Sequence, residues 1–100
     1  DRELLSNNGL VVISSTLSKK DKSMIIDPEI ITRGFIYSKE NNEIINEIKR
    51  ISTEIIRNNT FSNKYADYVK IRNDIREQVG QYLYKETQCK PVILTVIQEI

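Results

Sequence analysis

The chain's hydrophobic pattern becomes regular at Leu10–Leu17, where an apolar run is followed by a mostly polar half. Its first four residues are apolar on both faces, and the second half, Ser14–Leu17, is mostly polar and is interpreted as the part with one face toward solvent. This pattern is typical of a strand that begins buried and ends near solvent. Ser18–Ser23 is a polar connector of hairpin length, so Met24–Ile26 is predicted to pair back as a second strand.

The pair Asp27-Pro28 is expected to interrupt that second strand. Proline donates no ladder hydrogen bond, and it pushes the preceding residue toward an extended shape. The apolar pattern then resumes and contains one unusual polar position, Arg33, directly before Gly34. We predict a turn or bulge near this pair, followed by extended backbone through Phe35–Tyr37.

Two helices are predicted in the middle of the chain. The first is expected to begin with Ser38 as its N-cap and to run to about Arg57. Its isoleucines recur at helical spacing and form one continuous stripe: Ile44, Ile45, Ile48, Ile51, Ile55 and Ile56. The second helix is expected to begin between Asn63 and Asp67. Its apolar stripe is Tyr68, Ile71, Ile75, Val79, Tyr82 and Leu83. Gly80 within it predicts a close approach of the helix backbone to a neighbour.

A last strand is predicted at Pro91–Ile97. It is apolar on both faces, which is typical of a central strand or of one covered on both sides. The expected order is therefore β-β-α-α-β, an α+β fold with a small three-stranded sheet and two helices on one face. One hundred residues predict a single domain, residues 1–100. The chain begins at Asp1 without an initiator Met, so we interpret it as a fragment of a longer protein.

Apolar surface remains after the helices are placed. Leu10–Ile13 and Val92–Ile97 are apolar on both faces, but two helices cover only one face of such a sheet. We expect a parent domain, a partner subunit or both to cover the other face. The candidate interface or interdomain residues are Arg33, Phe35, Tyr37, Val92, Leu94 and Val96. For Arg33 two interpretations stay open: satisfaction of buried carbonyls or a carboxylate at the bulge, or contact with a neighbouring domain or RNA.

The chemistry-bearing residues argue against a catalytic site. The sequence has no histidine, which removes the usual zinc ligand, the usual general base and any dyad that depends on one. We therefore expect no catalytic residue, metal site or cofactor in this chain. Cys89 cannot form an internal disulfide, and we interpret it as a partly buried structural thiol.

The charge pattern gives no sign of a nucleic-acid or membrane surface. Fifteen basic and 14 acidic residues are mixed along the chain, with a net charge of +1 and no basic stripe. Lys19, Lys20 and Lys22 are interpreted as a solvated hairpin tip. No apolar run approaches the roughly 18 residues of a membrane span, and a cytoplasmic location is expected.

Three segments carry a resemblance to a known family: Gly9–Ile13, Asp27–Tyr37 and Tyr84–Leu94. Together they resemble the C-terminal domain of bacterial ribonuclease J, in matching order and over essentially all of the chain. Family members carry a segment like Gly-Pro-Asp-Ile-Ile-Ser-Arg-Gly-Phe-Val-Tyr, and an ending like Arg-Pro-Met-Ile-Leu-Pro. This chain departs from the pattern at Asp27, where a small residue is usual, and at Thr95, where proline is common.

The resemblance implies a parent with a metallo-β-lactamase domain and a β-CASP insertion. Such enzymes bind zinc through upstream His- and Asp-rich motifs and act on RNA as 5′→3′ exonucleases and endonucleases in RNA processing and decay. None of those motifs occurs here, so no catalytic residue is carried over. The C-terminal domain is associated with homo- or hetero-oligomer assembly and with full activity of the parent.

Two other functions remain to be weighed against a role in assembly. An autonomous RNA-binding module would need exposed aromatic side chains on which bases could stack. Phe35 and Tyr37, however, lie in an apolar context that favours burial. A stand-alone enzyme is the weaker alternative, because no histidine is present.

Overall fold

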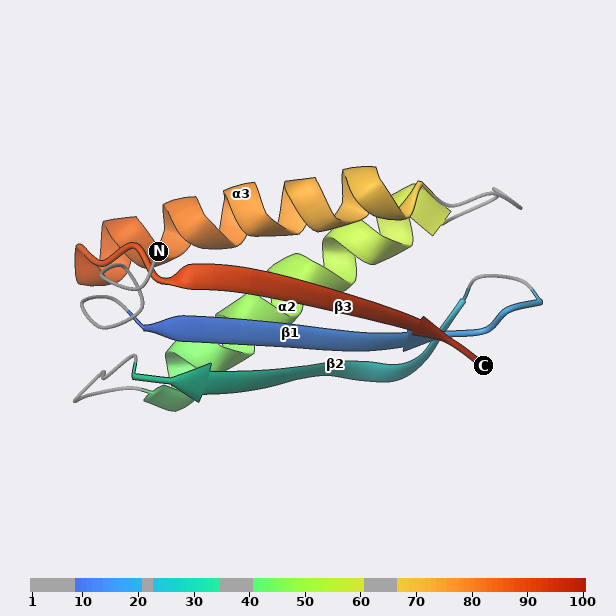
Figure 1. The fold of residues 1–100 in the computed structure, drawn as a ribbon, viewed down its shortest axis with the longest axis horizontal. Coiled ribbons are helices and arrows are strands. Elements are labelled where there is room, and N and C mark those ends of the chain that lie inside the picture. The colour runs from blue at the N-terminus through green and yellow to red at the C-terminus, as the bar shows by residue number, and fades with distance from the viewer. Residues whose placement is uncertain (1–8, 21–22, 35–40, 61–66) are drawn as a thin grey trace.

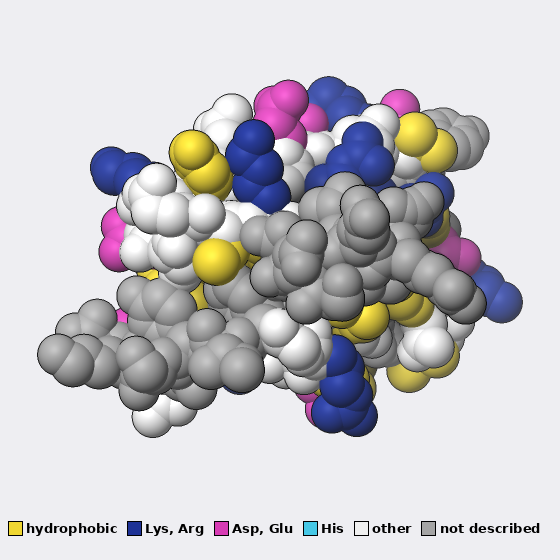
Figure 2. Space-filling model, turned by 60° about the vertical axis from the view of Figure 1, so that its left-hand side comes forward, with side chains coloured by type: hydrophobic (Ala, Val, Ile, Leu, Met, Phe, Trp, Pro, Cys, Tyr) yellow, Lys and Arg dark blue, Asp and Glu magenta, His cyan; other side chains and the backbone are white. Residues whose placement is uncertain are grey.

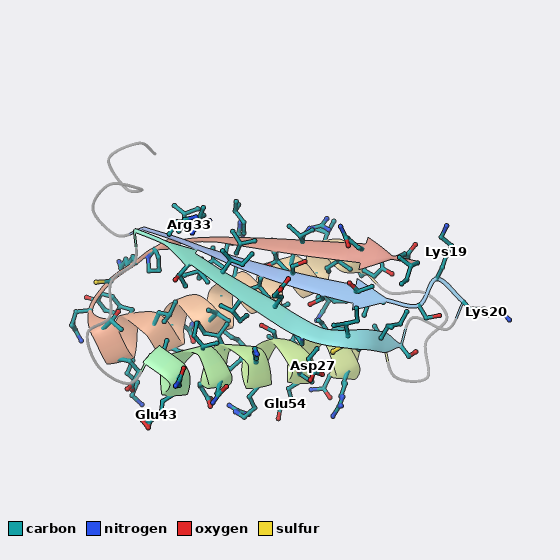
Figure 3. All side chains as sticks on the ribbon, turned by 90° about the horizontal axis from the view of Figure 1, so that it is seen from below. Lys19, Lys20, Asp27, Arg33, Glu43 and Glu54 are labelled. Atoms are coloured by element: carbon teal, nitrogen blue, oxygen red, sulfur yellow. The ribbon has the colours of Figure 1, made fainter. Side chains whose placement is uncertain are left out.

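The computed structural model describes residues 9–20, 23–34, 41–60 and 67–100 (Figure 1). The predicted order β-β-α-α-β is confirmed. The elements are β1 (Leu10–Leu17), β2 (Met24–Arg33), α2 (Asn41–Thr60), α3 (Tyr68–Thr87) and β3 (Val92–Glu99). They form two layers, with both helices on one face of the sheet (Figure 3).

The sheet has the strand order β2-β1-β3, so the first strand is central. β1 pairs antiparallel with β2 across a hairpin and parallel with β3. The parallel pairing requires a long crossover connection, and α2 and α3 lie within it. Of the two alternatives predicted for the last strand, a central position is wrong, because β3 is at the edge of the sheet formed by the described strands; cover on both of its faces stays a prediction. The apolar residues on both faces of β3 predict that both faces are covered. They do not predict which strands pair with β3.

The second strand also differs from its prediction. β2 is continuous from Met24 to Arg33, and Asp27-Pro28 does not interrupt it. Its register against β1 shifts twice, between Ser14 and Thr16 and between Thr16 and Leu17, so the irregularities lie around Ile25–Pro28 and not near Arg33. Proline is tolerated there because β2 is an edge strand. Gly34, with a φ of 67°, follows the end of the strand.

The hydrophobic core lies between the sheet and the two helices. Val11, Ile13 and Leu17 of β1 are fully buried and lie on one face of the strand. The prediction that this strand ends near solvent was wrong, because Leu17 at its end is as buried as Val11 near its start. The predicted helical stripes face these three residues. The buried helical residues are Ile44, Ile48, Ile51, Ile55, Ile56, Ile71, Ile75, Val79 and Leu83. Burial of each large aliphatic side chain contributes about 1.5–3 kcal/mol, so this cluster supplies most of the force that holds the layers together.

The helix ends follow local capping chemistry. α3 begins at Tyr68, one residue past the predicted window, with Asp67 as its N-cap; the Asp67 carboxylate accepts a hydrogen bond from the backbone N–H of Lys70. α2 continues to Thr60, three residues beyond the predicted end at Arg57. The side chains of Asn59 and Thr60 donate to the carbonyls of Ile55 and Ile56. The predicted N-cap, Ser38, lies outside the described residues.

Gly80 does not mark a close backbone approach, contrary to the prediction. A Cβ added there would lie 3.6 Å from Cδ1 of Ile93, which is ordinary van der Waals contact.

Gly80→Ala is therefore expected to stabilise the fold by about 1 kcal/mol, because alanine is the better helix former. Urea unfolding measures the change. Gly34→Ala is the control and should destabilise the fold, because its φ of 67° is strained for alanine. A loss of stability in Gly80→Ala would contradict this account.

Candidate interface on the open sheet face

The face of the sheet turned away from the helices is defined by the strand register. Directly opposed residues on neighbouring strands point to the same side of a sheet. We call the following set the open face: Leu10, Val12, Ser14 and Thr16 from β1, Ile26, Glu29, Ile31 and Arg33 from β2, and Val92, Leu94, Val96 and Gln98 from β3. Figure 3 shows both described helices, α2 and α3, on the opposite side of the sheet.

The apolar residues of the open face form a continuous surface. Its central row is Ile31, Val12 and Leu94, which oppose one another across the three strands. Ile31 and Leu94 are 42% and 50% exposed, and Val96 is 41% exposed. Scattered exposed aliphatic residues need no explanation, but a contiguous apolar patch marks an interaction surface. The leftover apolar surface expected from the sequence is therefore present, and nothing in the described part of the chain covers it.

The structure brings four of the six candidate interface residues together. Val92, Leu94 and Val96 follow one another along β3 on the open face, and Arg33 lies at the end of β2 in the same row as Val92. Phe35 and Tyr37 lie outside the described residues. The six candidate residues did not include Leu10, Val12, Ile26 and Ile31, although Leu10–Ile13 was expected to carry leftover apolar surface. These four share the open face only through the register of β1 with β2, which their own spacing does not reveal.

Arg33 is exposed, and the bulge lies several residues away from it. The interpretation that it satisfies buried groups at a bulge was therefore wrong. Figure 3 shows it at one end of the sheet, opposite the end that carries Lys19 and Lys20. Those two lysines are exposed next to the turn, as predicted for a solvated hairpin tip, and Lys22 lies outside the described residues. Contact of Arg33 with a neighbouring domain or with RNA remains a prediction.

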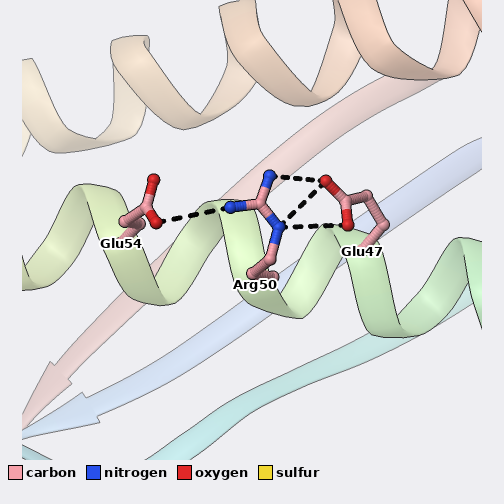
Figure 4. Close-up of polar contacts among 3 residues, drawn as sticks. All are labelled: Glu47, Arg50 and Glu54. Atoms are coloured by element: carbon pink, nitrogen blue, oxygen red, sulfur yellow. Dashed lines mark hydrogen bonds and ion pairs between the residues drawn. The ribbon is translucent and has the colours of Figure 1, made fainter.

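The outer face of α2 carries a local ion network and no reactive site (Figure 4). The Arg50 guanidinium donates to the Glu47 carboxylate, with 2.6 Å between Nη2 and Oε2, and it also lies 3.3 Å from Glu54 Oε2. The hydrogen bond from Arg50 lowers the pKa of Glu47, and the same contact raises the pKa of Arg50. These groups are solvent-exposed, so the network contributes little to stability.

The described residues offer no group that could bind a metal ion. No three His, Cys, Asp or Glu side chains cluster suitably among them. Cys89 is half-buried, and its backbone N–H donates to Thr87 Oγ1. Basic and acidic side chains are interspersed on the surface seen in Figure 2. Neither described helix is both long and apolar enough to cross a membrane.

Comparison with known proteins assigns this arrangement to a family. The sequence profile of the ribonuclease J C-terminal domain matches residues 1–100, the whole of the chain. The chain belongs to the ribonuclease J C-terminal domain family. The resemblance in the three segments Gly9–Ile13, Asp27–Tyr37 and Tyr84–Leu94 is thereby confirmed.

Individual relatives agree with the family match over the full length of this domain. Ribonuclease J2 of Bacillus subtilis is 33% identical over 100 residues. The proteins named ribonuclease J 2 of Staphylococcus saprophyticus and Streptococcus pyogenes are 32% and 29% identical over the same length. The match covers 100% of this chain and 18% of each relative. The chain thus corresponds to one domain of these ribonucleases.

Proposed function

We propose that this domain supports the oligomer assembly and the activity of a zinc-dependent ribonuclease J, and that it does so without a catalytic role of its own. The observation that carries the proposal is the apolar row of Ile31, Val12 and Leu94 on the open face. Burial of this row by another subunit or domain would remove from water a surface that the domain's own helices leave exposed. Arg33 lies at the margin of the same face, where interfaces commonly carry arginine.

The wider function of the parent follows from its family. The matched relatives are named as ribonucleases, and the family resemblance implies 5′→3′ exonuclease and endonuclease activity in cytoplasmic RNA processing and decay. Zinc would be held by the upstream metallo-β-lactamase domain, since no described cluster in this chain fits a metal ion. The partners proposed for this domain are the upstream metallo-β-lactamase and β-CASP domains and a second subunit, homologous or identical.

The open face is less suited to RNA than to protein. Its twelve residues include no aromatic side chain on which a base could stack, and its only charges are Glu29 and Arg33. The described tyrosines, Tyr68, Tyr82 and Tyr84, all lie on α3. An autonomous RNA-binding module would instead show RNA affinity that falls steeply with salt, because binding releases counterions from phosphates. A filter-binding salt series on the isolated domain distinguishes the two functions.

A lysine on the open face of the parent enzyme tests the proposal. Leu94→Lys places a charge in the central row, so assembly should weaken by about 100-fold or more, the loss expected when a buried apolar contact is replaced by a buried charge. Exonuclease activity per subunit should therefore fall at low enzyme concentration and recover as the concentration rises. Val69→Lys, on an exposed residue of α3, is the matched control and should leave the profile unchanged. A loss of activity that does not depend on enzyme concentration would refute the role in assembly.

A further inference from the structure

A groove runs between the outer edge of β3 and helix α3. Among the described residues, β3 pairs with β1 along one side and with no strand along the other. Figure 1 shows α3 beyond the other side of β3, so the helix extends past the sheet that it covers. The groove has a volume of about 610 Å³, and its apolar lining includes Gly80 and Tyr84 from α3 and Pro91, Val92 and Leu94 from the last strand and its approach. The space lies where a fourth strand of the sheet would be.

The main chain of β3 presents a regular row of polar groups to its free edge, and the groove lies beside the first part of that edge, Val92–Leu94. The Val92 N–H donates to the Gly9 carbonyl at 2.9 Å, and the Ile100 N–H donates to the Leu17 carbonyl at 3.0 Å. Even-numbered residues of the strand therefore direct their backbone groups toward β1. Backbone direction alternates along a strand, so Ile93, Thr95 and Ile97 direct theirs toward the free edge. A second extended chain is the partner that such a row fits.

The two edges of the sheet differ in their protection against pairing. The β2 edge carries Pro28 and a register irregularity, two devices that prevent an edge from accepting another strand. The register of β3 is continuous over its whole length, and Val92–Ile97 contains neither proline nor a charged residue. The Oγ1 atom of Thr95, in the middle of β3, is buried without a hydrogen-bond partner in the described structure. An edge of this kind is one that a native protein covers or pairs.

The segment that pairs with the free edge of β3 must be a strand without a helix of its own on the helix-covered side of the sheet. α3 already lies beneath the vacant position, so a second copy of the domain, joined edge to edge, would direct its own helices into the same layer. A single extended segment meets no such obstacle. Arg76 and Lys90 outnumber Glu77 among the charged residues that line the groove, which favours a segment with a carboxylate side chain.

The source of the segment follows from the length of the relatives and from the path of the chain. Most of each relative lies outside the matched region, which is 18% of its length. The chain enters the sheet at Gly9, whose carbonyl bonds Val92 at the end of β3 that lines the groove. We propose that an extended segment of the same parent polypeptide, from outside these 100 residues, adds as a fourth strand to the free edge of β3 above α3. This rests on the proposed function only in that the domain works within a longer ribonuclease J.

Residue-resolved amide hydrogen exchange in the parent ribonuclease and in the 100-residue chain tests this inference. The amides of Leu94, Val96 and Gln98 bond β1 and should exchange slowly in both. The amides of Ile93, Thr95 and Ile97 should exchange at least about tenfold more slowly in the parent, because an added strand would bond them. Equal exchange of these three amides in the two proteins would overturn the proposal. Protection that appears only as the parent concentration rises would also overturn it, because the strand would then come from another molecule.

Two proline variants distinguish the loss of strand pairing at the free edge of β3 from unfolding of the domain. Thr95→Pro removes a backbone N–H that points outward, so the domain should stay folded in the parent while Ile93 and Ile97 lose their protection. Val96→Pro removes an N–H that bonds β1 and should unfold the sheet. Full protection of Ile93 and Ile97 in the folded Thr95→Pro parent would contradict the fourth strand. If the parent assembles through the open face while these amides exchange rapidly, the inference fails and the proposed function stands.

Discussion

Ile48→Ala is expected to lower the free energy of unfolding by about 2–5 kcal/mol, the range for removing a large aliphatic side chain from a core. Ile48 is fully buried in the stripe of α2 that packs against the sheet and α3. The substitution removes three carbon atoms and leaves a cavity that a close-packed interior fills only in part. A domain of this size has about 5–15 kcal/mol of total stability, so the loss is a large fraction of it. Urea denaturation followed by circular dichroism measures the change.

Ile31→Ala makes the same chemical change on the open face. Ile31 is 42% exposed and lies outside the core cluster, so the isolated domain should lose less than about 1 kcal/mol. Both variants are measured at a concentration where the domain is monomeric, because association would stabilise the unmodified open face. Equal losses at the two positions would show that the core and the open face have been assigned to the wrong sides of the sheet.

The sequence was most informative for elements whose buried residues recur at a regular spacing of a few residues. β1 was predicted with its observed bounds, Leu10–Leu17, because its apolar run and the polar connector that follows it both lie within a few residues. The isoleucine stripe of α2 was predicted for the same reason, since residues three and four apart share a face of a helix. A start of α3 after Asn63 could be predicted because Asp67 is a typical N-cap and satisfies a local backbone N–H.

The remaining features depend on pairing between distant segments. β3 was expected to be central or covered on both sides, and only its register with β1 shows that Leu94 and Val96 are exposed at an edge. Pro28 was expected to break its strand, because its position on an edge could not be known beforehand. For the candidate site, the three residues predicted on β3 share the open face, and Ile31 lies beside them only through the observed register.

Val96→Lys is expected to weaken self-association of the isolated domain by about 100-fold or more. Val96 is 41% exposed on the open face, and a lysine there would have to be buried without a partner charge when the face is covered. The fold should be retained, because the side chain points away from the core. Sedimentation equilibrium over a series of concentrations measures the association, and circular dichroism confirms the fold.

Val69→Lys provides the matched control for that measurement. It introduces the same side chain at a residue that is 60% exposed on α3, away from the open face. Its association constant should equal that of the unmodified domain. If both variants weaken association equally, added positive charge is the cause and the location of the interface is not supported.

The central claim is that the open face is an assembly surface, and the solution mass of the unmodified domain across concentration tests it most directly. The monomer has a mass of 11.7 kDa. Exposed apolar surface of this kind drives association that follows mass action. We predict that the weight-average mass at sedimentation equilibrium rises above the monomer value as the concentration increases. A mass that stays at the monomer value at the highest concentration would contradict the claim.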